Sequence, residues 1–387
     1  MRRTVFYIAG FDPRGPLHYH RLYASEAAKQ SAVNGQAMTV SKRRNEGALQ
    51  SLWTVETGTT ATEFRFLRYE DIVRRQWPRN AFDMYGGIWR YVWQFLRMGV
   101  FTRIWQNSWP GFLAVIYPPA LLLAVFLLAL LLGLGVSAVA RPWIGALGLL
   151  AVAPALALPF AVYRLLEAGP NAFWLARSCT FLVDRAQGRV PGLEERCSEF
   201  ADIISKSIAS GSSDEVLVVG HSVGTHVAVT VAARTLERIG STQRFSLMTL
   251  GQAMVMTPDE PTARQFRADL LALSGSAQVD WVDVTSAVDG ACIALSDPLM
   301  LSGVIRPAGT RQQPKLVSAR FNKLFSPKTY AAIRRNFLRT HFQYLMAAEM
   351  AGDYDYFLIT AGDTTLAQRF AHLESVAGFN RFRMGQR

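Results

Sequence analysis

The sequence has few charged residues and few cysteines for its length. Only 18% of its 387 residues are charged, whereas 50% are hydrophobic. A charged fraction below the roughly 25% usual for soluble domains excludes a disordered or fibrous chain and points towards a membrane. The three cysteines, Cys179, Cys197 and Cys292, match the spacing of neither a zinc site nor a disulfide framework, so we expect reduced, structural thiols.

Motifs for nucleotides, metals and nucleic acids are also missing. The sequence contains neither G-x-G-x-x-G nor a Walker lysine. No set of His, Cys and carboxylate residues has ligand spacing, so we expect no metal and no cofactor. The formal net charge of +12 would suit nucleic acid or anionic lipid, but the arginines gather beside the most apolar part of the chain. With no nucleic-acid-binding motif recognisable, the expected partner is a lipid bilayer.

Acidic residues are absent from a long central stretch. Residues 84–166 contain no Asp or Glu, and two apolar runs lie within them, at about 120–140 and 143–163. Each run is long enough as a helix to cross the roughly 30 Å hydrocarbon core of a bilayer. Only Arg141 and Pro142 separate the runs, so the sequence predicts a tight transmembrane hairpin that turns at these two residues.

The arginines predict the orientation of this hairpin. The N-terminal apolar run before Asp12 is too short for a signal peptide. One arginine lies in the expected turn, and many more flank the outer ends of the spans, which places both soluble parts in the cytoplasm. We therefore expect an integral protein of the inner or plasma membrane with both termini and the soluble domain cytoplasmic. The flanking arginines are Arg74, Arg75, Arg79, Arg90, Arg97 and Arg103 before the hairpin, and Arg164, Arg177 and Arg185 after it.

The segment between Asp83 and Pro110 is rich in aromatic and basic residues. Four tryptophans alternate there with arginines, and no acid interrupts them. This composition is typical of a helix lying in the lipid headgroup layer, with a helix of the soluble core as the alternative. In either case the segment adjoins the bilayer.

The remaining sequence alternates short apolar runs with amphipathic stretches. This alternation predicts an α/β fold with a mostly parallel sheet and helices on both faces. We expect one domain formed by residues 1–80 and 190–387, with residues 81–189 inserted as the interfacial helix and the hairpin. Strands are expected at 4–9, 37–41, 49–56, 63–69, 215–219, 245–250 and 278–284, and helices at 18–33, 193–209, 223–238 and 263–273.

The sequence Gly220-His-Ser222-Val-Gly224 follows an apolar strand and leads into a helix of small residues. A G-x-S-x-G in this position predicts a nucleophile elbow, a sharp strand-to-helix turn that projects the serine hydroxyl above the sheet. The two glycines remove side chains that would collide in so tight a turn. In these residues the chain resembles the α/β-hydrolase superfamily, and the resemblance covers the soluble parts rather than the hairpin.

That resemblance implies a triad in the chain order Ser, Asp or Glu, His, with Ser222 as nucleophile. Only His341 and His372 lie far enough beyond Ser222. His372 falls in an amphipathic helical pattern, which is typical of a surface residue. His341 is followed by Phe-Gln-Tyr344, similar to the His-x-x-Tyr around the base of class 3-like lipases, and is the favoured base.

The acid implied by the resemblance lies in the turn after a strand, where Asp289 stands. The stretch resembles the lipase pattern in which the Asp precedes Pro-Val-Pro, but Gly290-Ala-Cys stands here instead. Asp283, within the strand, and Asp297, before a proline, remain rival candidates.

An oxyanion hole requires two main-chain N–H groups aimed at the developing negative charge. Val223 supplies one, and the loop after the first strand supplies the other, from Phe11 or, alternatively, Asp12. Together these residues predict a membrane-anchored serine hydrolase of an ester or thioester, with a lipid or acyl substrate expected from its location. The alternative is a catalytically silent α/β-hydrolase-like scaffold; the sequence does not define the oligomeric state.

Overall fold

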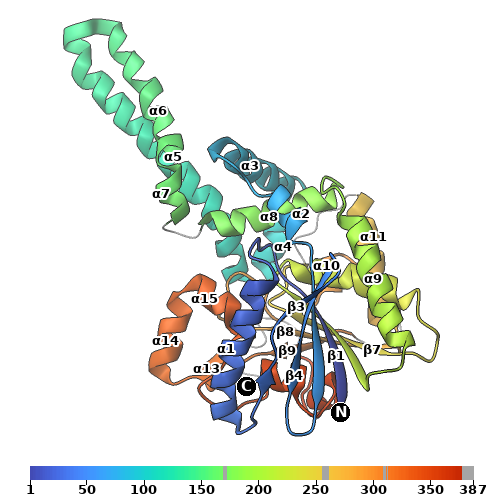
Figure 1. The fold of residues 1–387 in the computed structure, drawn as a ribbon. Coiled ribbons are helices and arrows are strands. Elements are labelled where there is room, and N and C mark those ends of the chain that lie inside the picture. The colour runs from blue at the N-terminus through green and yellow to red at the C-terminus, as the bar shows by residue number, and fades with distance from the viewer. Residues whose placement is uncertain (169–171, 255–260, 308–310, 312, 377–387) are drawn as a thin grey trace.

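The structure is a computed structural model that describes residues 1–168, 172–254, 261–307, 311 and 313–376. A mixed sheet lies between two layers of helices, and a long helical arm projects away from one end of these layers (Figure 1). The predicted α/β architecture with a mostly parallel sheet is therefore confirmed.

Within these described ranges the sheet has nine strands, in the order β2-β4-β5-β1-β6-β7-β8-β9, and β3 pairs with β4. The strands from β5 to β9 along this order are all parallel. Their bounds are Ala61–Leu67 for β5, Arg2–Ile8 for β1, Glu215–His221 for β6, Phe245–Leu250 for β7, Val279–Thr285 for β8 and Lys315–Ser318 for β9.

The edge beyond β5 is antiparallel. There, β4 (Gln50–Glu56) pairs antiparallel with β5, and β2 (Thr39–Val40) and β3 (Arg44–Glu46) pair antiparallel with β4. Only four residues connect β4 to β5. So short a link closes a hairpin but cannot cross over to a parallel neighbour, which explains this departure from the parallel pattern.

Both faces of the sheet are buried, as the strand β1 illustrates. Phe6 and Ile8 point into one apolar core, and Val5 and Tyr7 point into the other. The first core is covered by α8 (Ala172–Ala186), α9 (Leu193–Ala209), α10 (Gly224–Leu236) and α11 (Pro261–Gly275). The second is covered by α1 (Pro16–Asn34) and by C-terminal helices that include α13 (Phe321–Leu324), α14 (Pro327–Arg335), α16 (Tyr356–Ala361) and α17 (Leu366–Arg369).

The central strands form a topological switch point. The chain leaves β1 for α1 on one face, whereas it leaves the neighbouring β6 for α10 on the opposite face. Loops that diverge in this way open a crevice at the carboxyl ends of the two strands, where α/β proteins bind their ligands.

The projecting arm contains both predicted spans. It consists of α5 (Trp109–Ile144), the 3-10 helix η1 (Gly145–Ala151), α6 (Val152–Ala161) and α7 (Tyr163–Ala168). By length and composition, Trp109–Trp143 and Gly145–Glu167 are two helical stretches that could cross a membrane, and only 17% and 6% of their most apolar windows are buried.

The predicted turn at Arg141 and Pro142 is wrong. The helix α5 continues through both residues to Ile144, and the chain reverses at Gly145, where φ is 56°. A positive φ of this kind suits glycine, whereas the ring of proline fixes φ near about −65°. The second span also differs from a single regular helix, because it starts as a 3-10 helix and its α-helical part is divided between α6 and α7.

The aromatic segment before the arm forms two helices rather than one, α3 (Ala81–Arg97) and α4 (Val100–Asn107), separated at Gly99 with φ of 63°. One face of α3 packs into the core through Met84 and Tyr91, whereas Trp89 and Trp93 are exposed on the other face. The alternative of a helix in the soluble core is therefore confirmed for the buried face of α3, and the location of the exposed face in the headgroup layer stays a prediction.

A buried ion pair ties the sheet to the C-terminal region. The Nε of Arg3 on β1 donates to Glu215 on β6 at 2.7 Å, and its other nitrogens donate to the carbonyl oxygens of Gly362 and Thr364. Glu215 also accepts hydrogen bonds from Ser246 and from the N–H of Leu366, both at 2.8 Å. Both side chains are almost completely buried.

We expect Arg3→Ala to lower the free energy of unfolding by about 3–5 kcal/mol, because it leaves the buried carboxylate of Glu215 without its cation. Chemical denaturation of the purified protein measures this change. Arg2→Ala removes an exposed arginine from the same strand and serves as the control. Equal stability of the two variants would contradict the prediction.

Candidate active site

Ser222 stands in the turn between β6 and α10 with a positive φ of 57°. This backbone conformation is strained for a residue other than glycine and is found at functional sites when the surroundings enforce it. Its own N–H donates to the carbonyl oxygen of Leu250 at the end of β7, at 2.8 Å, and its carbonyl oxygen accepts the N–H of Thr225 at 3.0 Å. The neighbouring strand and the first turn of α10 thus hold the serine in place.

Three glycines make room for this turn. A Cβ on Gly220 would lie 2.6 Å from the Cβ of Ala228, and a Cβ on Gly224 would overlap the carbonyl oxygen of Ala9. A Cβ on Gly10 would lie 3.0 Å from the Cβ of Ser222. The loop after β1 therefore packs directly against the serine, and the G-x-S-x-G glycines are required by these close approaches.

Asp289 and His341 lie together in the core, although 52 residues separate them in sequence. The Nδ1 of His341, on α15 (Phe337–Phe342), donates to Oδ2 of Asp289 at 2.9 Å. Burial would raise the pKa of the Asp289 carboxyl, but the adjacent His341 imidazole and the N–H of Ala291 hold that pKa below its ordinary value. Asp289 is therefore ionised and fixes the imidazole with Nε2 as the acceptor nitrogen.

The other nitrogen of this imidazole makes no hydrogen bond to Ser222 in this structure. Nε2 of His341 is buried and has no hydrogen-bond partner among the described residues. A Cβ on Gly251 would lie 3.3 Å from both Cε1 of His341 and Oδ2 of Asp289. Because Ser222 is hydrogen-bonded to Leu250, the residue before Gly251, the same short turn touches the serine on one side and the His–Asp pair on the other.

His221, inside the elbow motif, supports His341. Its Nε2 donates to the main-chain carbonyl of His341 at 3.0 Å, and the two rings are 4.9 Å apart. Burial, and next the neighbouring His341, lower the pKa of His221 to about 3, so its ring is neutral. The sequence analysis assigned no role to His221. Its position directly before Ser222 was the feature that could have indicated one.

Tyr344 positions the loop that carries the acid. Its hydroxyl accepts the N–H of Ser286 at 2.8 Å, and its ring lies 6.4 Å from the ring of His341. In the His-x-x-Tyr pattern, His341 thus binds the carboxylate of Asp289, and Tyr344 binds Ser286 at the start of the loop that carries Asp289.

The rival acids lie elsewhere. Asp283 points from β8 to Thr249, whose hydroxyl donates to it at 2.5 Å, and burial raises the pKa of this carboxyl to about 8. Asp297 caps α12 (Pro298–Leu301) through the N–H of Leu299 and forms an ion pair with Arg306. Neither contacts His341, and the rival base His372 is exposed and paired with Asp353.

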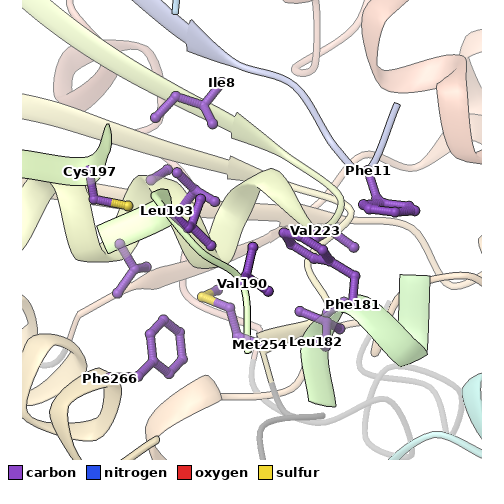
Figure 2. Packing of buried hydrophobic residues seen from close by; sticks show 14 of the residues in the cluster. Ile8, Phe11, Phe181, Leu182, Val190, Leu193, Cys197, Val223, Met254 and Phe266 are labelled. Carbon is purple, nitrogen blue, oxygen red and sulfur yellow. The ribbon is translucent and has the colours of Figure 1, made fainter. Parts of the chain in front are cut away.

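The two expected oxyanion donors lie on either side of the switch point. Val223 follows Ser222 directly, and Phe11 follows Gly10, which packs on Ser222. In the part of the chain that the structure describes, the N–H of Asp12 donates to Gly10 at 2.8 Å, whereas those of Val223 and Phe11 have no acceptor. The side chains of Phe11 and Val223 anchor their loops in the core near Phe181, whose ring is 4.7 Å from that of Phe11 (Figure 2).

Comparisons with protein-family models, with curated proteins and with solved structures found no match to this chain. Among the described residues, no group of three or more His, Cys, Asp or Glu side chains is arranged to hold a metal ion. All three cysteines are free and buried. The site thus consists of a strained serine, a buried carboxylate–imidazole pair and two main-chain donors.

The buried Asp283 predicts a pH-dependent loss of stability. Its carboxyl ionises near pH 4 in the unfolded chain but near pH 8 in the folded chain. Between these values only the folded chain keeps the proton, so the free energy of unfolding falls as the pH rises from about 4 to about 8. Asp283→Asn removes this fall.

Thermal unfolding at pH 5 and pH 9 measures the effect. We expect Asp283→Asn to raise the unfolding temperature relative to the parent at pH 9, and by much less at pH 5. Asp202→Asn, at an exposed carboxyl on α9, is the matched control and should show no such difference. A gain for Asp283→Asn that is the same at both pH values would be inconsistent with a protonated Asp283.

Proposed function

We propose that this chain is a membrane-anchored serine hydrolase of the α/β-hydrolase type, which cleaves an ester or thioester of a lipid or acyl substrate. The observation that carries the proposal is the buried Asp289–His341 pair, which packs against Gly251, the residue after Leu250, whose carbonyl oxygen accepts the N–H of the strained Ser222. Strain at one serine and a partnerless buried imidazole both cost free energy, and a nucleophile–base pair gives both of them a use.

The order of the elements supports the α/β-hydrolase assignment. Ser222, Asp289 and His341 follow one another along the chain in the superfamily's order. The serine follows β6, and the strand beside it, β1, leads into the loop of Phe11. Both oxyanion donors therefore come from the two loops that meet at the switch point, as this type of site requires.

In the proposed reaction, Oγ of Ser222 attacks the acyl carbonyl carbon while its proton passes to Nε2 of His341. The tetrahedral oxyanion accepts hydrogen bonds from the N–H groups of Val223 and Phe11, and Asp289 stabilises the imidazolium. His341 then gives the proton to the departing alcohol or thiol, which leaves an acyl-enzyme. Water, deprotonated by His341, attacks this ester and releases the acid.

The projecting arm supports the membrane location. The helix α5 has 36 residues and is therefore about 54 Å long, more than the roughly 30 Å hydrocarbon core requires. Both ends of the arm return to the folded domain, and arginines concentrate at those ends. By the positive-inside tendency, both termini and the site lie in the cytoplasm, at an inner or plasma membrane.

Covalent labelling with a fluorophosphonate probe tests the chemistry. We expect the wild type in membranes to be labelled and Ser222→Ala and His341→Ala not to be. Asp289→Asn should slow labelling by about 10⁴-fold, because the imidazole loses the partner that fixes its tautomer. Two variants serve as controls. Ser210→Ala changes an exposed serine directly after the last residue of α9, and Asp283→Asn changes a buried carboxylate that does not contact a histidine.

The labelling result also distinguishes the hydrolase from the alternative, a catalytically silent scaffold. The low exposure of Ser222, 9%, is compatible with this alternative. A folded wild type that remains unlabelled would favour the scaffold. Labelling that persists in Ser222→Ala would mean that another residue is the nucleophile.

Thiol accessibility tests the orientation. Trp143 is 86% exposed near the tip of the arm, and Ser212 is exposed in the loop before β6. We expect an impermeant maleimide to label Trp143→Cys in intact cells but Ser212→Cys only after permeabilisation. The parent, whose cysteines are buried, gives the background. The reverse pattern would refute a cytoplasmic site.

A further inference from the structure

A large open cavity lies between the base of the arm and the proposed catalytic residues. Its volume is about 670 Å³, within the roughly 300–1,000 Å³ of small-molecule sites. Leu113 and Tyr117 of α5 line one side, Leu175 of α8 another, and Phe337 of α15 a third. The wall is thus mostly apolar and is built jointly by the arm and the soluble domain.

This cavity adjoins the catalytic pair. Val288 and Gly290, which flank Asp289, both line it. The ring of Trp174 lies 6.1 Å from that of Phe337 in the cavity wall and 5.2 Å from that of His341. The side chain of Trp174 therefore lies between the cavity wall and the imidazole of His341, and neither Ser222 nor His341 is among the described residues that line the cavity.

The cavity is also continuous with the surface of the proposed span. Leu113 and Tyr117 lie one helical turn apart on α5 and are 48% and 40% exposed. The same face continues along the helix at intervals of three or four residues. Its next members, Ala120, Ala124 and Leu128, are all exposed. An unbroken apolar track thus leads from the lipid-facing part of α5 into the cavity.

The polar rim of the cavity is basic. Arg335, at the end of α14, lines the cavity and is exposed, and no acidic side chain lines the cavity among the residues that the structure describes. An exposed guanidinium beside an apolar cavity is suited to the phosphate of a lipid whose chain enters that cavity.

We propose that this cavity holds an acyl chain of an anionic glycerophospholipid, which enters laterally from the bilayer along α5 with its phosphate beside Arg335. This inference rests on the proposed hydrolase function and names its substrate class. The ester bond to glycerol breaks, an ester bond between the acyl carbon and Oγ of Ser222 forms, and the proton from Ser222 passes through His341 to the glycerol oxygen. Water then releases the fatty acid, and the other product is a lysophospholipid.

The test compares two substrates on the full-length protein. Vesicles of dioleoyl phosphatidylglycerol report the lipid reaction through released oleate, and p-nitrophenyl acetate reports the chemistry without a long chain. Leu113→Trp fills part of the cavity. Leu123→Trp places the same side chain on the same helix at an exposed position outside the cavity and is the matched control.

We expect Leu113→Trp to lower the ratio of oleate release to acetate hydrolysis by about tenfold or more, because excluding even two methylenes from an apolar site has an effect of this size. Leu123→Trp should leave the ratio unchanged. Arg335→Glu should reduce oleate release from dioleoyl phosphatidylglycerol at least fivefold more than from dioleoylglycerol, which has the same acyl chains but no phosphate, whereas Arg334→Glu, at the exposed neighbouring arginine, should not.

The outcomes separate this inference from the proposed function. An unchanged ratio in Leu113→Trp, with the wild type labelled by the fluorophosphonate, would overturn the cavity assignment and leave the hydrolase intact. Equal loss of both reactions in Leu113→Trp would mean that Leu113 positions the catalytic groups, and it would also overturn the cavity assignment. Equal effects of Arg335→Glu on the two lipids would overturn the phosphate contact. A folded wild type that neither labels nor hydrolyses acetate would end both proposals.

Discussion

The close approach of three main-chain segments is the constraint on which the candidate site depends. The loop after β1, the turn after β6 and the start of α10 meet with no space for side chains at Gly10, Gly220 and Gly224. This contact forces Ser222 into its positive φ and brings the loop of Phe11 beside it. Beyond this contact the two adjacent loops diverge, because the chain leaves β1 for one face of the sheet and β6 for the other.

The inserted segment is a structural part of the site as well as a candidate anchor. A Cβ on Gly111, in the first turn of α5, would lie 2.8 Å from Cδ1 of Ile293, in the loop that follows Asp289. Ala114 of α5, Leu175 of α8 and Ala291 form a small apolar cluster at the same place. The acid loop is therefore packed against the base of the arm, so a change in the arm reaches the carboxylate through direct contacts.

Burial alone does not define the role of a carboxylate in this protein. Asp283 and Asp289 are both buried near the end of β8. Asp283 is protonated and Asp289 is ionised, because the side chains around them differ. Thr249 offers Asp283 one neutral hydrogen bond, and burial keeps its pKa high. Asp289 lies beside the His341 imidazole and accepts the N–H of Ala291, which keep its pKa low. The distinction lies in the neighbouring side chains rather than in the strand.

The sequence alone determined the features that depend on neighbouring residues: most strands and helices, the apolar spans and the strand–Ser222–helix turn. These features follow from short-range periodicity and from glycine spacing. Tertiary structure alone decided the reversal at Gly145, the selection of Asp289 over Asp283 and Asp297, and the contact of His221 with His341. Each of these depends on residues far apart in the chain or on a backbone angle set by packing, and local patterns contain no information about such distances.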